Sequence, residues 1–509
     1  MSVNRRTRSV PDDRGLRLWN VGWALAVTFV AAVLVAGGVF YGLVALLDFQ
    51  GIDRKAKLDA KTLFDLVKLS FGVVAGAGAL VALVVAYRRQ HVDEVGAHRE
   101  ATRLHTERFS QAVDKLGSDS PAVRLGGVHG LAGLADDAPD DSLRQTCIDV
   151  LCAYLRLPFP TDPGELPNPL PDDTPPAEVQ RETHQDKKDR YHALREVRHT
   201  ILRLIGDHYR IAHGTHRSWQ GCTLDLTGVT IDGDIDFTGA TFAKGRVSFD
   251  RATFSDGRVS FDRATFVGGR VTFHRTMFAG GRVTFHEAQF TGSGVTFHEA
   301  AFSGSKVSFW GATFSGAVSF HDTAVTGGRV GFSSATFSGT VGFDRSAFRD
   351  GPVSFHRAQF SGGQVTFHEA QFTGSRVTFY QATFADGLVI FEDATFSGGA
   401  VSFDEARFTG GEVSFEHATL SCGELSFEHA TLSCGELSFE HATLSGSEVT
   451  FEHAAFSGSR VTFHDTTFSG SRVSFDETTG PAPSGLLTAV GTPVPSAIRL
   501  RADWLPTSP

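Results

Sequence analysis

The chain has 509 residues and a formal net charge of −10 at pH 7, with 41% hydrophobic and 20% charged residues. This length and apolar content exclude a wholly disordered chain and predict two or more structural units. The acidic balance argues against a general nucleic-acid binder, and five scattered cysteines are too few for a disulfide scaffold.

Two uncharged segments near the N-terminus predict transmembrane helices. Residues 21–47 exceed the roughly 20 residues that cross a bilayer, and residues 69–87 form a second run that ends at Arg88 and Arg89. The length of the first run and the presence of the second disfavour a cleaved signal peptide. Basic flanks place both termini on the cytoplasmic side. We therefore expect a multi-pass protein of the cell membrane with the lipid bilayer as a partner.

Each predicted span contains two glycines four positions apart, Gly38 with Gly42 and Gly72 with Gly76. This spacing lets helix backbones approach closely in lipid. Its expected use is to pack the two spans on each other, and the alternative is a homodimer through these glycines or through the ends of the repeat domain. No ionisable side chain lies within either span, so no ion pathway is predicted.

A helical cytoplasmic region follows over residues 88–157, and its last helix contains Cys147 and Cys152. Five positions apart on a helix, these thiols do not face the same way, so they are interpreted as core residues rather than metal ligands. Of the histidines between 184 and 208, only His192 and His199 share a helix face. Nothing completes a coordination shell there.

Phenylalanine dominates the second half of the chain, which repeats itself from Leu226 onward. Twenty phenylalanines from Phe249 to Phe475 follow one another at a 12-residue step, with two shorter 11-residue steps. A unit has the pattern Val-x-Phe-x-x-Ala-x-Phe, followed by polar residues that usually include glycine. Apolar residues two apart point to the same side of a strand, so the pattern predicts a parallel β-solenoid.

The length of one coil follows from packing. A 12-residue coil would be too thin to enclose two phenylalanines, a valine and an alanine, whereas a 24-residue coil with four large side chains packs well. The two short steps end at Phe320 and Phe343, so they fall at the same corner of successive 24-residue coils. We expect about ten coils and a length near 50 Å at a strand spacing of about 4.8 Å.

The first repeats keep a strict five-residue step, with Leu226-Thr-Gly-Val-Thr-Ile231 and Phe237-Thr-Gly-Ala-Thr-Phe242. This resembles the pentapeptide-repeat family, and the chain as a whole resembles its bacterial membrane-anchored members. The resemblance implies a right-handed quadrilateral parallel β-helix. The later units depart from the family pattern as an expanded form, five plus seven instead of five plus five. Such a resemblance is specific for fold and not for function.

Outward side chains at equivalent positions of successive 24-residue coils should stack along the corners. These rows are interpreted as solvated polar corners, because nothing closes a metal shell. The expected pairs are His274 with His298, His417 with His441 and His429 with His453, beside Glu416, Glu428, Glu440 and Glu452. Cys422 and Cys434 should lie on opposite sides of one coil.

The corner charges change along the repeat. Early units repeat arginine and late units repeat glutamate, at Arg246, Arg258, Arg270 and Arg282 and at Glu412, Glu424, Glu436 and Glu448. No nucleophile motif, phosphate loop or acid–base pair is evident, so no enzyme activity, catalytic residue, cofactor or metal is predicted. The function expected is a scaffold for an unidentified protein partner at the cytoplasmic membrane face. The alternative is a DNA-mimicking inhibitor of a topoisomerase-like enzyme.

The predicted fold class is a two-span helical hairpin and a short helical region followed by a β-solenoid. The predicted segments are a basic tail (1–20), transmembrane helices (21–47 and 69–87) joined by a short loop (48–68), a helical region (88–157), a proline-rich linker (158–183), a helix and lead-in (184–221), the solenoid (222–479) and a C-terminal cap (480–509).

Overall fold

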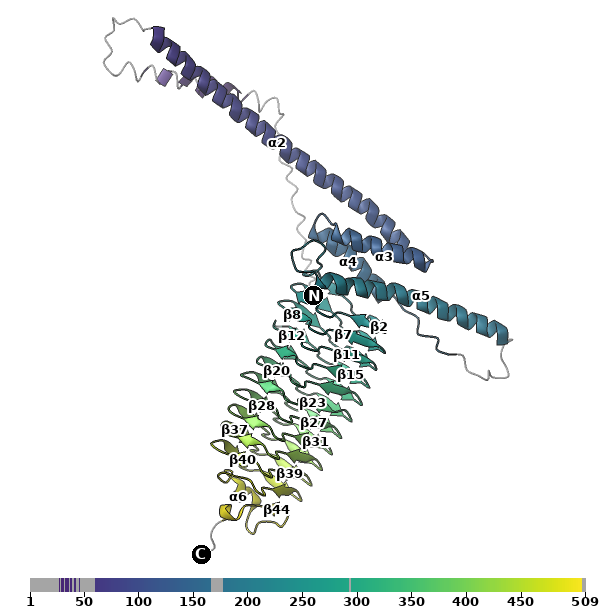
Figure 1. Cartoon of the computed structure of the whole chain (residues 1–509), viewed down its shortest axis with the longest axis vertical. Coiled ribbons are helices and arrows are strands. Elements are labelled where there is room, and N and C mark those ends of the chain that lie inside the picture. The colour runs from purple at the N-terminus through teal and green to yellow at the C-terminus, as the bar shows by residue number, and fades with distance from the viewer. Residues whose placement is uncertain are drawn as a thin grey trace, which may run out of the picture. The chain divides into compact units, whose positions relative to one another are not determined.

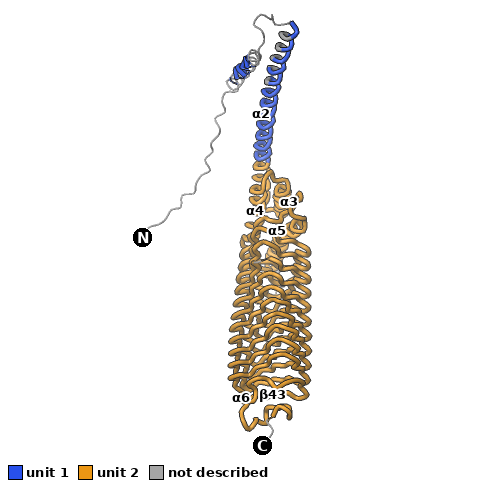
Figure 2. The backbone as a smooth tube through the Cα atoms, turned by 90° about the vertical axis from the view of Figure 1, so that its left-hand side faces the viewer, with its two compact units in different colours: residues 1–104 blue, residues 105–509 orange. Residues whose placement is uncertain are grey.

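The computed structural model describes scattered residues between 27 and 45, and residues 60–165, 177–292 and 294–505. The chain divides into two compact units, residues 1–104 and 105–509, which Figure 2 colours separately. The first unit contains most of a long helix, α2 (Ala60–Leu116). Among the described residues, the second contains helices α3 to α6 and strands β1 to β44.

The two predicted membrane spans differ in how much of each the structure describes. Much of the first, 21–47, lies outside the described residues. The second, 69–87, lies within α2, which also includes residues 60–68 of the predicted loop. Over the part of the chain that the structure describes, no helix is both long and apolar enough to cross a membrane. The predicted spans are therefore not found there.

Three helices precede the solenoid within the second unit, namely α3 (Pro121–Asp136), α4 (Asp141–Arg156) and α5 (Ala177–Arg210). Asp140 caps α4, because its carboxylate accepts a hydrogen bond of 2.9 Å from the amide of Leu143. Helix α5 begins at Ala177, inside the segment that the prolines predicted to be a linker. Residues 166–176 of that segment lie outside the described residues.

The solenoid has four parallel sheets, one on each side of the coil, and successive coils are stacked along its length in Figure 1. Sheets A and B have 11 strands each, sheet C has 12 and sheet D has 10. The first strands of sheets A to D are, in order, β1 (Leu224–Asp225), β2 (Thr230–Asp232), β3 (Ile235–Asp236) and β4 (Thr241–Ala243). Their last strands are, in the same order, β41 (Arg460–Thr462), β42 (Thr467–Ser469), β44 (Ile498–Arg499) and β40 (Ala455–Phe456).

Strands β1 to β39 each pair with the strand four positions later, so the predicted 24-residue coil is confirmed. Val247 of β5 (Arg246–Ser248) lies opposite Val271 of β9 (Arg270–Thr272). The two short steps both fall at the corner between sheets D and A, where Val318 lies opposite Val341. The sheets give about eleven coils, one more than expected.

The core consists of columns of phenylalanine rings that run along the solenoid. Rings that follow sheet A stack from coil to coil, as Phe249 does on Phe273 at 4.9 Å with 4° between their planes. Rings that follow sheet C form a second column, and the two columns meet edge to face, with Phe249 and Phe261 6.0 Å apart at 88°. Both geometries are favourable for aromatic pairs. Columns on sheets B and D are less uniform and include Val325, Leu420 and Leu432.

A tight turn follows each of these phenylalanines. The amide of Ala252 donates to the carbonyl of Phe249 at 2.9 Å, and between them Arg251 has a φ of 56°. Corresponding non-glycine residues repeat this left-handed conformation along both corners, and Gly311 occupies it in one coil with a φ of 65°. A left-handed backbone costs a residue with a Cβ about 1–2 kcal/mol. The repeat pattern alone did not predict these turns.

Helix α5 covers the first coil of the solenoid. A Cβ atom at Gly206 would lie 2.6 Å from the carbonyl oxygen of Asp236, so only glycine permits this approach. Asp232 accepts hydrogen bonds from the Tyr191 hydroxyl at 2.7 Å and from Arg195 Nε at 2.9 Å. Burial alone would raise the pKa of Asp232, but hydrogen bonds from His199, Tyr191 and Arg195 outweigh it and hold that pKa well below its usual range.

The other end of the solenoid is covered by residues 480–505. Strand β44 extends sheet C, and α6 (Leu486–Val490) packs against β42. The Trp504 ring lies 5.5 Å from the ring of Phe475, the last of the repeated phenylalanines, and its indole N–H donates to the carbonyl of Gly480 at 3.3 Å. The last core ring is thereby covered.

Truncating a ring in the stacked column should destabilise the solenoid far more than changing one on sheet D. Phe379 stacks at 4.7 Å on Phe355 and at 4.6 Å on Phe403, so we expect Phe379→Ala to cost about 3–5 kcal/mol. Phe384→Leu should cost less than about 1.5 kcal/mol, because leucine already occupies the same column at Leu432. Urea unfolding followed by circular dichroism measures both. Phe384 is also stacked, at 4.7 Å on both Phe360 and Phe408. The matched change is therefore Phe379→Leu, and a loss equal to that of Phe384→Leu would contradict a special role of the column that follows sheet C.

Candidate functional site: charged corners of the solenoid

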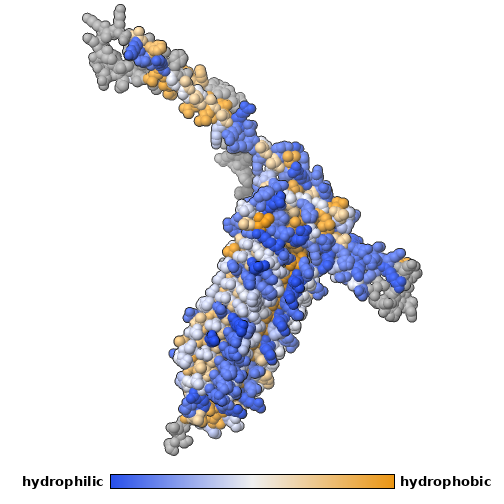
Figure 3. Space-filling model, in the orientation of Figure 1, coloured by the Kyte–Doolittle hydropathy of each residue, from blue (hydrophilic) through white to orange (hydrophobic). Residues whose placement is uncertain are grey.

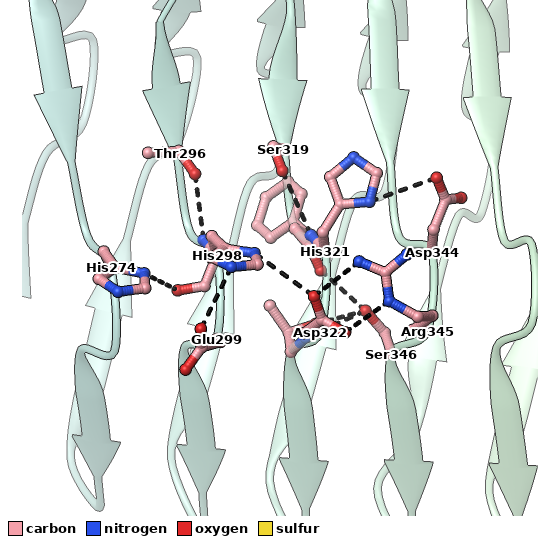
Figure 4. Close-up of polar contacts among 12 residues, drawn as sticks. His274, Thr296, His298, Glu299, Ser319, His321, Asp322, Asp344, Arg345 and Ser346 are labelled. Carbon is pink, nitrogen blue, oxygen red and sulfur yellow. Dashed lines mark hydrogen bonds and ion pairs between the residues drawn. The ribbon is translucent and has the colours of Figure 1, made fainter.

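The outward residues of each turn form two rows along the solenoid. We call the row that follows sheet A the A–B corner, and Figure 4 shows part of it. His274 and His298 stack there with ring centroids 5.2 Å apart and 8° between their planes. The other two predicted histidine pairs are also stacked, at 4.9 Å for His417 with His441 and 4.7 Å for His429 with His453. The predicted ladders are thus confirmed.

Oppositely charged side chains of adjacent coils pair along the central part of the A–B corner. Arg275 Nε lies 2.6 Å from Glu299, and Arg345 Nε lies 2.9 Å from Asp322. The hydrogen bond from Arg275 lowers the pKa of Glu299, and that from Arg345 lowers the pKa of Asp322. His298 lies between these pairs, with Nε2 3.2 Å from Glu299 and Nδ1 3.6 Å from Asp322. The row is a partly exposed network of compensated charges.

Two groups on this corner bring three potential metal ligands together, with ligand atoms within 4.8 Å of one another. They are His274 with His298 and Glu299, and His368 with Glu392 and Asp393. A cation at the first group would have to compete with Arg275 for the carboxylate of Glu299. Each group offers fewer ligands than the four of a structural zinc site.

Among the described residues of the helical region, His105 Nε2 lies 3.7 Å from Cys147 Sγ, but no third potential metal ligand joins this pair. His199 approaches Asp232, while His208 approaches Asp136 at 3.1 Å and stacks on Trp219 at 4.1 Å. Cys147 and Cys152 are both buried, as expected of core residues. Burial raises the pKa of Cys147 to about 11 and that of Cys152 to about 12, so both thiols are protonated and unreactive.

Cys422 and Cys434 are both free and exposed. Cys422 precedes β35 (Glu424–Ser426) of sheet C, and Cys434 precedes β37 (Glu436–Ser438) of sheet A. They therefore lie at opposite corners of the coil, as the 24-residue repeat predicted.

The early arginines separate onto two opposite sheets. Arg246 and Arg270 begin strands of sheet A, whereas Arg258 and Arg282 begin β7 (Arg258–Ser260) and β11 (Arg282–Thr284) of sheet C. The predicted 24-residue coil already implies that residues 12 positions apart lie on opposite sides, and the structure assigns these sides to sheets A and C.

The cations on sheet C form the longer row, which we call the basic row. Arg258, Arg282, Lys306 and Arg329 lie on four successive coils in register, and all four are exposed. The first three line a shallow groove of about 460 Å³ together with glycines and Asp234. Within the described part of the chain, none of their side chains has an ion pair. Like charges on adjacent strands are destabilising, so this row has a folding cost, and the carboxylate in its groove, Asp234, lies beside the first cation only.

An acidic groove lies toward the other end, at the corner between sheets D and A. Glu412 and Glu436 lie opposite each other on β33 (Glu412–Ser414) and β37. They line a groove of about 700 Å³ that also includes Arg460. Partial burial in this groove raises the pKa of Glu412, and the charges of Glu436 and Glu416 raise it further.

Comparison with protein families gave a match within the repeat. Residues 218–265 and 379–431 match a family model described as pentapeptide repeats in nine copies. These two stretches are similar to pentapeptide repeats. Both matched stretches lie almost wholly within the four-sheet solenoid. Comparison with curated proteins gave no match.

Removing the charge of Glu412 should stabilise the protein at neutral pH. Because its pKa is raised in the folded protein, folding favours the protonated carboxyl. The protonated carboxyl of Glu412 makes its full contribution to the free energy of unfolding below the pKa of a glutamate in the unfolded chain. This contribution is lost as pH rises through the pKa of Glu412 in the folded protein. We expect Glu412→Gln to gain about 0.2–1 kcal/mol at pH 7, the range for adjacent like charges.

Thermal unfolding at pH 7 and at about pH 4 measures this difference, which should vanish at the lower pH. Glu448→Gln is the matched control, because Glu448 lies between Glu424 and Arg472 and loses one repulsive and one attractive neighbour. An equal gain in the control would show that net charge, rather than the acidic groove, is responsible.

Proposed function

We propose that this protein is a non-enzymatic scaffold whose solenoid binds a protein partner through its charged faces. The observation that supports this most directly is the basic row on sheet C, four exposed cations in register without an ion pair in the described chain. An acidic segment of a partner lying along the row would offset the repulsion between neighbouring cations. A scaffold binds its partner without a chemical step, so this function requires no catalytic residue.

The shape of the surface agrees with a protein partner rather than a small substrate. The face of the solenoid visible in Figure 3 is mostly hydrophilic, and the grooves on its corners are shallow and lined by backbone and charged side chains. Small-molecule sites are usually concave and largely apolar. Charged, regular faces instead favour steering and orientation of a macromolecule with opposite charge.

We further propose that the N-terminal part of the chain attaches the scaffold to the cytoplasmic face of the cell membrane. Residues 69–87 contain no charged residue, and several apolar side chains of this segment are exposed, with Leu80 at 65% and Leu83 at 66%. Exposed apolar side chains without a protein partner favour contact with lipid. A homodimer through the glycines of this region and of 21–47 stays a prediction.

Inhibition of a nucleic-acid enzyme by DNA mimicry is the second candidate. The late glutamates form a row of negative charge on sheet A and another on sheet C, and each row is two coils long. On the next coil the equivalent positions are basic, Arg460 on sheet A and Arg472 on sheet C. A DNA mimic requires an extended acidic surface. This observation favours the protein scaffold.

Reversing the charge of the basic row should abolish partner binding. Affinity capture of the full-length protein from gently solubilised membranes would identify the partner, and binding of the purified partner would then be measured. We expect Arg258→Glu with Arg282→Glu to weaken binding at least about tenfold through lost charge complementarity. The matched control is Arg246→Glu with Arg270→Glu, the same change on neighbouring coils of sheet A. Equal loss in both variants would contradict a site on sheet C, and inhibition of DNA supercoiling by the full-length protein would favour mimicry.

Membrane attachment is tested by flotation of the full-length protein with liposomes. We expect Leu80→Asp with Leu83→Asp to reduce the floating fraction severalfold, because each aspartate opposes entry into the hydrocarbon region. Val92→Asp with Val95→Asp is the control, since both valines are exposed on α2 beyond the uncharged segment. Unchanged flotation of the first variant would exclude attachment through residues 69–87.

A further inference from the structure

The helices that precede the solenoid enclose a hollow of about 770 Å³. Its walls come from α3, the end of α4, residues 157–163 and α5, the helices grouped beside the first coil in Figure 1. The volume lies within the usual range of small-molecule sites, about 300–1,000 Å³. The solenoid grooves are open and shallow, so this hollow is a separate kind of surface.

Four cationic side chains line the hollow, and among the described residues no carboxylate does. They are Arg124, Lys187, Arg190 and Arg198. Within the described part of the chain, none of the four forms an ion pair. The charge of Asp232 acts on Arg198, but the carboxylate of Asp232 is already bound by Tyr191, Arg195 and His199. The hollow therefore holds an excess of positive charge.

Arg198 provides the most specific sign of a missing ligand. The residue is only 4% exposed, and its guanidinium donates to the carbonyl of Thr230 at 3.1 Å. Its Nε atom is buried and has no hydrogen-bond partner among the described residues. Burial lowers the pKa of Arg198, which shows that desolvation opposes its charge. A buried donor on a charged group is costly unless it is paired, and an anion would pair it.

Neighbouring contacts hold the cations and provide apolar surface. The Arg198 guanidinium lies over the ring of Phe159, 4.7 Å from its centroid. Arg124 donates to the hydroxyl of Tyr154 at 3.3 Å and also to the carbonyl of Ser118. Both aromatic rings line the hollow. Guanidinium groups held by packing lose little freedom when they bind a planar or tetrahedral oxyanion.

We propose that this hollow binds a small ligand through a phosphate group, with Arg198 and Arg124 as fixed donors and Lys187 and Arg190 as exposed cations at its edge. Phosphate oxygens accept several charge-assisted hydrogen bonds at once, which matches the number of donors present. The aromatic walls favour a ligand with a flat apolar part, such as a nucleotide. This site is independent of the proposed partner-binding row on sheet C.

Isothermal titration of the full-length protein with pyrophosphate, ADP and adenosine tests the proposal. We expect pyrophosphate and ADP to bind, ADP more tightly, and adenosine not to bind. Lys187→Gln with Arg190→Gln should weaken ADP binding at least about tenfold, because two charge-assisted contacts are lost. Lys188→Gln is the control, since Lys188 is the next residue of α5 but does not line the hollow.

Arg198→Lys is a second variant that keeps the charge and loses the planar donor fork, so it should weaken the binding of ADP and of pyrophosphate by a similar factor. Circular dichroism checks that each variant is folded. Titration with a soluble short-chain phosphatidic acid forms the second arm, because the N-terminal part of the chain would bind vesicles by itself. Binding of this lipid that is lost in the Lys187 and Arg190 variant, without ADP binding, would assign the phosphate to a lipid headgroup. Absence of binding in both arms, or an equal loss with Lys188→Gln, would overturn the proposal.

Discussion

Stacking of phenylalanine rings between coils is the interaction on which the rest of the structure depends. Rings of the columns after sheets A and C lie close to the ring of the next coil, as Phe273 does over Phe297 at 4.6 Å and Phe332 over Phe355 at 5.0 Å. That spacing agrees with the distance between paired strands, so ring stacking and backbone hydrogen bonding favour the same register. A slip by one position would turn every ring toward solvent.

The same register determines the surface. Because inward residues repeat every coil, outward residues also meet their counterparts every coil, whether their charges attract or repel. At the A–B corner the result is compensation, with Arg275 bound to Glu299 and Arg345 to Asp322. On sheet C the result is repulsion between Arg258, Arg282 and Lys306. Because the stability of the solenoid comes mainly from its core, the solenoid tolerates these rows of like charge. The charged faces can therefore serve the proposed binding of a partner.

The helical region differs because it does not repeat. Its helices cover the first coil through Gly206, Asp232 and Tyr209, and they use a different set of contacts from the solenoid. Irregular packing between helices and an extended segment leaves a hollow, whereas a stack of equal coils leaves only shallow corners. The two proposed binding activities are therefore located in parts of the chain with different geometry, one for an extended acidic partner and one for a phosphate-bearing small ligand.

The sequence by itself determined the translational repeat. Its 12-residue step, with two shorter steps, was enough to predict the 24-residue coil, the four large core residues per coil and the stacked pair of His274 with His298, because a periodic sequence folds into a periodic contact pattern. Only the tertiary structure decided what local spacing does not specify. It gave Arg251 a left-handed backbone and brought Arg124 and Arg198 to one hollow from helices distant in sequence. Such contacts depend on how non-repeating segments pack, and no periodicity encodes them.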